Sequence, residues 1–144
     1  MDLGQREKIA SVTMHACHDD FAGIGAGFGF LVRFKIIASN QADFSRSEVV
    51  VDQTEKKFSN PKLVPVTYKV NSHARYFRVE AVELRERKND FIFALAELEL
   101  FNADSINLAA GKKVTAKDSI EAPIRWRKSN LADGKWAKSK NPEI

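Results

Sequence analysis

The densest group of potential metal ligands and nucleophiles lies near the start of the chain: His15, Cys17, His18, Asp19 and Asp20. On an extended strand His15 and Cys17 share a face, whereas Cys17 and His18 point to opposite faces and make a poor catalytic dyad. A zinc site normally needs a second pair of ligands elsewhere. The chain offers only one further histidine, His73, and no second cysteine. We therefore interpret the group as ordinary polar residues at the start of a loop.

Three segments together supply the aromatic rings and charged side chains that are typical of sugar sites. They are the glycine-rich stretch from Asp19 to Phe28, the charged loop from Arg85 to Asp90, and Arg125-Trp126-Arg127. An aromatic face stacks on a sugar ring, while charged groups bind its hydroxyls. The predicted ligand-binding residues are His18, Asp20, Phe21, Arg85, Arg87, Arg125 and Trp126. Trp126 has an alternative role as a hydrophobic lid on the core.

The glycine spacing Gly23-x-Gly25-x-Gly27 is weak evidence for a phosphate site, because no Lys-Ser/Thr pair and no helix pattern follow it. No paired acid and base, catalytic triad or complete metal set is recognisable elsewhere. We therefore expect a binding protein and not an enzyme.

Composition indicates one globular domain of mildly basic character. The 144 residues are 44% hydrophobic, enough for a single core, and the formal net charge is +4. Between residues 112 and 140 there are nine Lys or Arg against three Asp or Glu, which suits either an anionic polymer or a solvated basic surface. The overall charge is short of that of a dedicated nucleic-acid protein, so we predict no nucleic-acid partner.

The sequence gives only limited information about the cellular location of the protein. A single cysteine, Cys17, allows no intrachain disulfide, and no apolar run is long enough to span a membrane. The first six residues lack the apolar region of a signal peptide. If the parent protein is exported, its signal is expected outside this chain.

Apolar residues recur mainly with a period of two, which predicts strands. The expected strands are Lys8–His15, Phe30–Ser39, Glu48–Asp52, Val66–Val70, Arg75–Leu84, Phe91–Phe101 and Lys112–Ala116. The stretch from His18 to Gly29 holds four of the seven glycines and is predicted to be a long loop. Many short strands separated by turns favour an antiparallel sandwich or barrel. The expected core residues are Val12, Met14, Phe34, Ile36, Val50, Val79, Ala81, Phe93, Leu95 and Leu98.

Several patches resemble the discoidin family, also called coagulation-factor C-type (F5/8 type C) or galactose-binding-like domains. Arg75-Tyr76-Phe77-Arg78-Val79 followed by the run from Phe93 to Phe101 is similar to the strands that end such domains. Asn107 to Ala116, followed by Asn130-Leu131-Ala132-Asp133-Gly134, looks like the family's opening, and Asp2-Leu3-Gly4 like its middle. More narrowly, the chain resembles accessory domains of bacterial α-L-rhamnosidase-like and planctomycete-type multidomain proteins. The residues that carry this are Phe28-Gly29-Phe30, the stretch from Leu84 to Leu98, and Asp118 to Pro123.

The resemblance implies an all-β, antiparallel two-sheet β-sandwich of jelly-roll type. It implies a non-catalytic carbohydrate- or glycan-binding accessory module from an exported or cell-surface parent protein; the alternative is a structural or protein-interaction domain without a small ligand. It also implies calcium near Glu97 and Asp133, since hard cations take carboxylate oxygens. Without calcium, Glu97 would pair with a basic residue and Asp133-Gly134 would be a plain turn. A concave pocket at the end carrying Asp20, Arg87 and Trp126 would favour the glycan module, and a covered surface the interaction domain.

The order of the patches departs from the family, because the opening pattern comes last in this chain. We expect one domain over residues 1–144 with permuted strand order, in which residues 105–144 fold back and supply a missing edge strand. The connection from Phe101 to Asn107 reaches about 20 Å at full extension. A segment swapped into a neighbouring copy, giving a homodimer, is therefore an alternative. A further alternative is that the chain holds most of one domain and the start of another.

Overall fold

The computed structural model describes residues 1–138, and its regular structure is almost entirely β. Strands and isolated bridges make up 46% of the described residues, and no α-helix is present among them. No helix there is long and apolar enough to cross a membrane. The strands are β1 Asp2–His15, β2 Cys17–Asp19, β3 Gly25–Phe28, β4 Arg33–Ser39, β5 Ser47–Gln53, β6 Val66–Glu83, β7 Arg85–Glu86, β8 Phe91–Ile92 and β9 Glu97–Phe101. Three short 3₁₀ turns complete the inventory: η1 Phe21–Gly23, η2 Ile124–Trp126 and η3 Lys128–Ala132.

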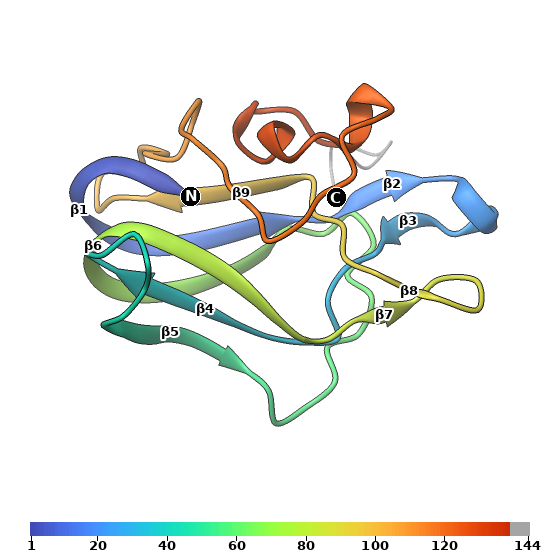
Figure 1. The fold of residues 1–144 in the computed structure, drawn as a ribbon, viewed down its shortest axis with the longest axis horizontal. Coiled ribbons are helices and arrows are strands. Elements are labelled where there is room, and N and C mark those ends of the chain that lie inside the picture. Colours follow the sequence, from blue (N-terminus) through green and yellow to red (C-terminus); the bar gives the residue numbers. More distant parts are fainter. Residues whose placement is uncertain (139–144) are drawn as a thin grey trace.

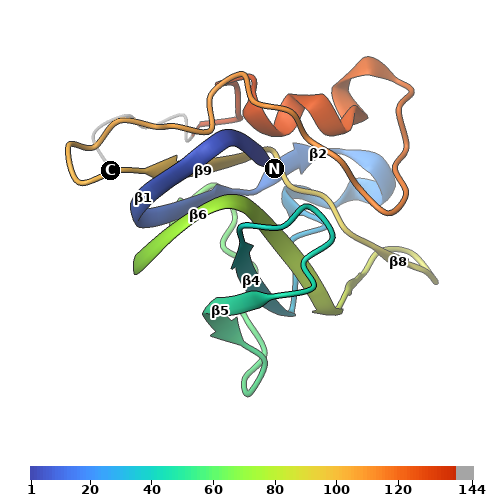
Figure 2. The same cartoon turned by 60° about the vertical axis from the view of Figure 1, so that its left-hand side comes forward.

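A five-stranded antiparallel sheet with the order β5-β4-β6-β1-β9 forms the body of the molecule (Figure 1). Two short hairpins, β2–β3 and β7–β8, extend from one end of it, and the C-terminal segment lies beyond β9 as a separate layer (Figure 2). The prediction of an all-β, antiparallel fold is confirmed. Its finer assignment to a jelly-roll sandwich stays a prediction.

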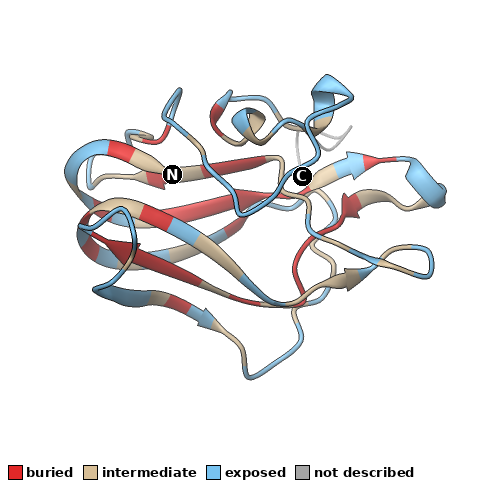
Figure 3. Ribbon diagram, viewed as in Figure 1, coloured by how far each residue is buried: buried red, intermediate tan, exposed pale blue. Residues whose placement is uncertain are grey.

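The core consists of aromatic and aliphatic side chains, many of them from the strands of the main sheet, and buried stretches of the inner strands are marked in Figure 3. Phe34 is fully buried and meets the rings of Phe30, Phe58 and Tyr68 with centroid separations of 6.1, 5.9 and 6.3 Å. Phe77 is buried to the same degree. Phenylalanine fits this role because it brings a large apolar surface without a polar group to satisfy.

Half of the ten predicted core residues are buried: Val12, Met14, Phe34, Ile36 and Leu98. Val50, Val79 and Leu95 are half-buried against the core. The predictions for Ala81 and Phe93 were wrong, since both are exposed, Phe93 to 39%.

The failure at Phe93 has a local cause. Residues 93–96 leave the strand, because the Ala94 amide donates to the Gly29 carbonyl and the Ala96 amide donates to the His15 carbonyl. The predicted strand Phe91–Phe101 is therefore two strands, β8 and β9, and the period of two does not hold across the gap. Conversely, the expected strands Val66–Val70 and Arg75–Leu84 are one continuous strand, β6.

The prediction of a long loop from His18 to Gly29 was also wrong, since β2 and β3 form a hairpin there. Two of the glycines, Gly27 and Gly29, allow other segments of the chain to pack closely against this hairpin. A side chain at Gly27 would overlap the Asn60 side chain, and one at Gly29 would come within 2.7 Å of the Ala94 side chain. Both also adopt positive φ, at 81° and 68°, which glycine tolerates without strain.

The C-terminal segment turns back over β9 immediately after that strand ends. An isolated bridge joins Phe101 to Asn107, and the Leu108 amide donates to the Leu100 carbonyl. Ala109 is fully buried. The predicted strand at residues 112–116 is wrong, because only an isolated bridge between Asp2 and Lys113 forms there. Completion of a sandwich by this segment stays a prediction.

Candidate functional site

Asp19 anchors the C-terminal segment to the β2–β3 hairpin. Alternation along β2 turns its side chain inward, where it is 7% exposed. One carboxylate oxygen accepts hydrogen bonds from Arg125 Nε at 2.9 Å and Trp126 Nε1 at 2.8 Å, and the other accepts from the Phe21 amide at 3.0 Å. Burial acts to raise the pKa of Asp19, but these three donors outweigh it and lower the pKa to about 2. Asp19 is therefore a fixed anion at neutral pH.

Phe21 sits at the centre of an aromatic and cationic cluster beside this anchor. Its ring meets Trp126 edge-on at 6.3 Å and Phe28 at 6.4 Å, and the Arg87 guanidinium lies 4.5 Å from its centroid. Arg87 is held in turn by two hydrogen bonds to Asp90, at 3.0 and 2.6 Å. The indole N–H and the guanidinium groups thus already have partners within the chain.

Six of the seven predicted ligand-binding residues lie in this cluster or beside it on the same hairpin, where His18 Nε2 is 3.0 Å from Asp20 Oδ1. The structure brings Phe21, Arg87 and Trp126 together, joins Arg125 to Asp19, and leaves His18 and Asp20 at the surface. The charged and polar groups at this end bond to one another, while the Asp20 and Arg125 side chains stay 87% and 61% exposed.

Arg85, the remaining predicted residue, lines a hollow of about 560 Å³ next to the cluster. The wall residues are Val32, Lys57, Phe58, Ser59, Glu83, Leu84, Arg85, Glu86 and Phe91, which we call the β6–β8 groove. Arg85 Nε donates to the Phe30 carbonyl at 2.9 Å, and its Nη2 donates to the Phe58 carbonyl at 2.7 Å. Burial lowers the pKa of Arg85 somewhat. The guanidinium is therefore a rigid part of the groove wall.

The groove wall as a whole contains one exposed aromatic ring and equal numbers of positive and negative side chains. Phe91 on β8 is 66% exposed. The Glu83 carboxylate lies 3.4 Å from Arg33 Nε and 3.6 Å from Lys57 Nζ. The backbone is fixed beneath them, because the Val32 amide donates to the Glu83 carbonyl and the Phe58 amide to the Val32 carbonyl. This open hollow therefore sets an exposed aromatic ring beside charged side chains that are held in place by other protein groups.

Glu97 is the most unusual carboxylate among the described residues. It is fully buried, its Oε2 accepts a 2.8 Å hydrogen bond from the Gly134 amide, and its Oε1 has no partner among residues 1–138. Its pKa is raised to about 7, chiefly by loss of hydration on burial; the Gly134 hydrogen bond opposes this rise, and the neighbouring Asp133 carboxylate adds to it. The structure thus brings together the two residues predicted to hold calcium.

The His/Cys group from the start of the chain does not converge. His15 is buried, contacts Glu99 through Nε2, and is stacked on Trp136 with centroids 3.9 Å apart. Burial raises the pKa of the Cys17 thiol to about 11, so it stays protonated at neutral pH. No cluster of three or more His, Cys, Asp or Glu side chains within residues 1–138 is arranged to hold a metal ion.

Sequence reasoning missed the anchor role of Asp19 and the groove residues Phe91, Glu83 and Lys57. The inward position of Asp19 follows from β2, which the glycine-rich pattern concealed. Phe91 was assigned to a continuous apolar strand, and no signal in that run marks it as exposed. Comparisons of the chain with models of protein families, with curated proteins and with solved structures found no match.

Proposed function

We propose that this chain is a non-catalytic carbohydrate-binding module, a β-sandwich of discoidin type, whose ligand site is the β6–β8 groove. The observation that carries the proposal is an exposed ring, Phe91, beside a guanidinium that two backbone carbonyls hold in place. The volume of about 560 Å³ falls within the usual range for small-ligand pockets.

The chemistry of the groove suits hydroxyl-rich ligands. The Phe91 ring offers a flat apolar surface for the C–H face of a sugar. Arg85 and Lys57 are donors, and Glu83 and Glu86 are acceptors, so vicinal hydroxyls would find both kinds of partner. Because the wall holds two cations and two carboxylates, no strong charge repels a neutral ligand.

A calcium ion is the second element of the proposal. An orphaned, buried Oε1 of Glu97 next to Asp133 fits a hard cation better than an ordinary turn. Glu97 and Asp133 would supply carboxylate oxygens, and backbone carbonyls or waters would have to complete the shell. Bound there, calcium would neutralise two adjacent carboxylates and link β9 to the C-terminal segment.

A protein-interaction domain is the alternative function, and one observation favours it. At the end carrying Asp20, Arg87 and Trp126 the polar groups bond to one another, and Phe21, Phe91 and Phe93 are 44%, 66% and 39% exposed. Exposed aromatic rings are typical of protein contact surfaces. In that case Phe91 would be part of a protein contact and would bind no sugar.

Phe91→Ala tests the groove, with Phe93→Ala as the matched control. Both remove an exposed phenylalanine, but only Phe91 lines the groove. A glycan array followed by calorimetry on any ligand found should show at least a tenfold loss of affinity for Phe91→Ala and little change for Phe93→Ala. Equal loss in both variants, or no glycan bound by the unmodified chain, would refute the groove as a sugar site.

A further inference from the structure

The charge of this chain is divided sharply between its two parts. Residues 1–111 contain 14 Lys or Arg and 15 Asp or Glu, a net charge of −1. Residues 112–144 contain 9 Lys or Arg and 4 Asp or Glu, a net charge of +5. All of the excess positive charge, +4 overall, therefore belongs to the C-terminal segment.

The structure places this segment as an outer layer. It runs back beside β9 and then caps the β1–β9 side of the sheet, which is the upper layer in Figure 1. Within residues 1–138, only Arg125 and Lys128 of its basic residues form ion pairs, with Asp19 and Glu121. Six others are exposed and make no ion pair there: Lys112, Lys113, Lys117, Arg127, Lys135 and Lys138.

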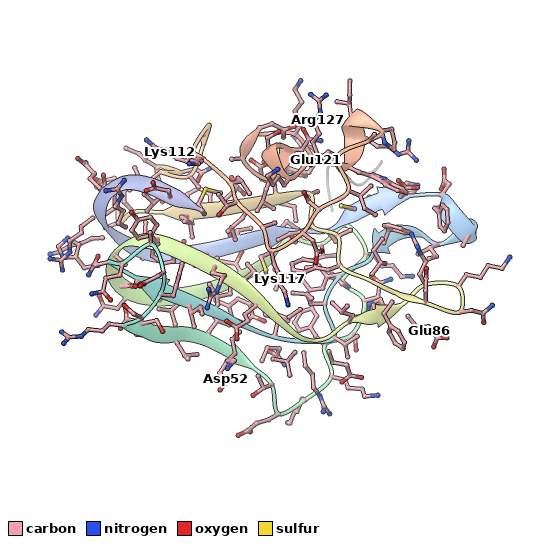
Figure 4. The ribbon with its side chains drawn as sticks, viewed as in Figure 1. Asp52, Glu86, Lys112, Lys117, Glu121 and Arg127 are labelled. Atoms are coloured by element: carbon pink, nitrogen blue, oxygen red, sulfur yellow. The ribbon has the colours of Figure 1, made fainter. Side chains whose placement is uncertain are left out.

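Figure 4 shows how these charges lie relative to the acidic residues. Lys112 and Arg127 project from the upper layer, where Glu121 also lies, and Lys117 is on the loop that descends from it. Asp52 and Glu86 lie toward the opposite side of the molecule. The segment is therefore an outer layer with an excess of positive charge, which we call the basic face.

We propose that the basic face binds a linear anionic polysaccharide, one that carries sulfate or carboxylate groups along its chain. This site is separate from the β6–β8 groove and does not depend on it. Lysine ammonium groups on flexible stems suit a repeating anion without fixed geometry. Neutralising a polyanion releases its condensed counterions, so binding should weaken steeply as salt rises.

The side chains of the segment disfavour nucleic acid as the partner. Proteins that bind single strands stack bases on free aromatic rings, and duplex readers present a helix or ribbon to a groove. Here Trp126 is bonded to Asp19 and packed on Phe21, and Trp136 is stacked on His15. Between residues 112 and 138 the regular structure is limited to the 3₁₀ turns η2 and η3. In this part of the segment positive charge is available, but neither tryptophan ring is free to stack on a base and no helix or β-ribbon is present to enter a groove.

The test compares two variants of the full chain with equal net charge. The first changes Lys112, Lys113 and Lys117 to glutamine. The control changes Lys8, Lys56 and Lys69 to glutamine, which are equally exposed but lie outside the basic face and the groove. Affinity for heparin and for alginate is measured by calorimetry at several salt concentrations, with duplex DNA as a competitor.

We expect the unmodified chain to bind at least one of the two polysaccharides near 0.15 M salt, roughly the physiological ionic strength. The first variant should lose tenfold or more in affinity and show a smaller salt dependence, whereas the control should change less than twofold. Equal losses in both variants would mean attraction by net charge alone and would overturn the proposal. So would the absence of binding to either polysaccharide, or tighter binding of DNA. Phe91→Ala should leave this affinity unchanged, which separates the basic face from the groove.

Discussion

Replacing Glu97 by glutamine should stabilise this protein at slightly alkaline pH in the absence of calcium. The native state holds the Glu97 proton more tightly than the unfolded chain does, because burial raises the pKa from 4.5 to about 7. Stability from this group is therefore fully present below about pH 4.5 and is lost as pH rises through about 7. At about 1.4 kcal/mol for each pH unit, the loss amounts to about 3 kcal/mol.

Glutamine cannot ionise, but it keeps an oxygen to accept the Gly134 amide hydrogen. Urea unfolding at pH 8 with a chelator should therefore give Glu97→Gln a free energy of unfolding up to about 3 kcal/mol higher than that of the unmodified chain. The difference should vanish near pH 4.5. Glu55→Gln, at an exposed loop position, serves as the control and should change little at either pH.

Added calcium should reverse the order, because it would stabilise the native state only where both carboxylates are present. The unmodified chain should gain stability and lose it again on chelation, while Glu97→Gln should not respond. A Glu97→Gln variant less stable than the unmodified chain at pH 8 with chelator would refute the argument from burial. An unmodified chain that melts at the same temperature with calcium and with chelator would refute the calcium site alone.

Other perturbations probe the core, the anchor and the C-terminal segment. Phe34→Ala should lower the free energy of unfolding by about 3 kcal/mol or more, and a loss below about 1 kcal/mol in urea would show that Phe34 is not in the core. Asp19→Asn should cost about 2 kcal/mol at neutral pH and remove the loss of stability between about pH 4 and 2; an unchanged acid profile would contradict the anchor role. Deleting residues 105–144 should expose the β9 edge and reduce stability or solubility, and an equally stable, soluble monomer would show that the segment is independent. Cys17 should react slowly with thiol reagents at pH 8, and fast labelling there would contradict a thiol pKa of about 11.

The β-rich class could be predicted because a period of two survives in the inner strands. Val12 and Met14 on β1, and Phe34 and Ile36 on β4, alternate inward as expected. Such alternation reports only local burial, however. It cannot tell where a strand ends when the next apolar residue is exposed, as at Phe93, or which neighbouring chain fills the space beside a glycine, as Asn60 does at Gly27.

Part of the candidate site could also be predicted, because local sequence shows where aromatic and charged residues gather. The residues near Phe21, Arg87 and Trp126 were found because aromatic and charged types cluster in those loops. Whether such groups face solvent or bond to one another depends on partners far away in sequence. Trp126 donates a hydrogen bond to Asp19, which lies 107 positions away in the sequence, and Arg85 donates hydrogen bonds to the carbonyl groups of Phe30 and Phe58. The position of the β6–β8 groove therefore depends on tertiary contacts, which cannot be predicted from residue type alone.

Both tryptophans of this chain, Trp126 and Trp136, lie in the C-terminal segment, and the five-stranded sheet contains none. Intrinsic fluorescence excited near the red edge of protein absorption therefore reports on this segment, whereas far-ultraviolet circular dichroism reports mainly on the sheet. Trp136 stacks on His15 of β1, so detachment of the segment changes the indole environment while the strands stay paired. The molecule thus carries a built-in optical label for one layer, and two unfolding curves recorded by these probes will coincide only if that layer and the sheet unfold as a single cooperative unit.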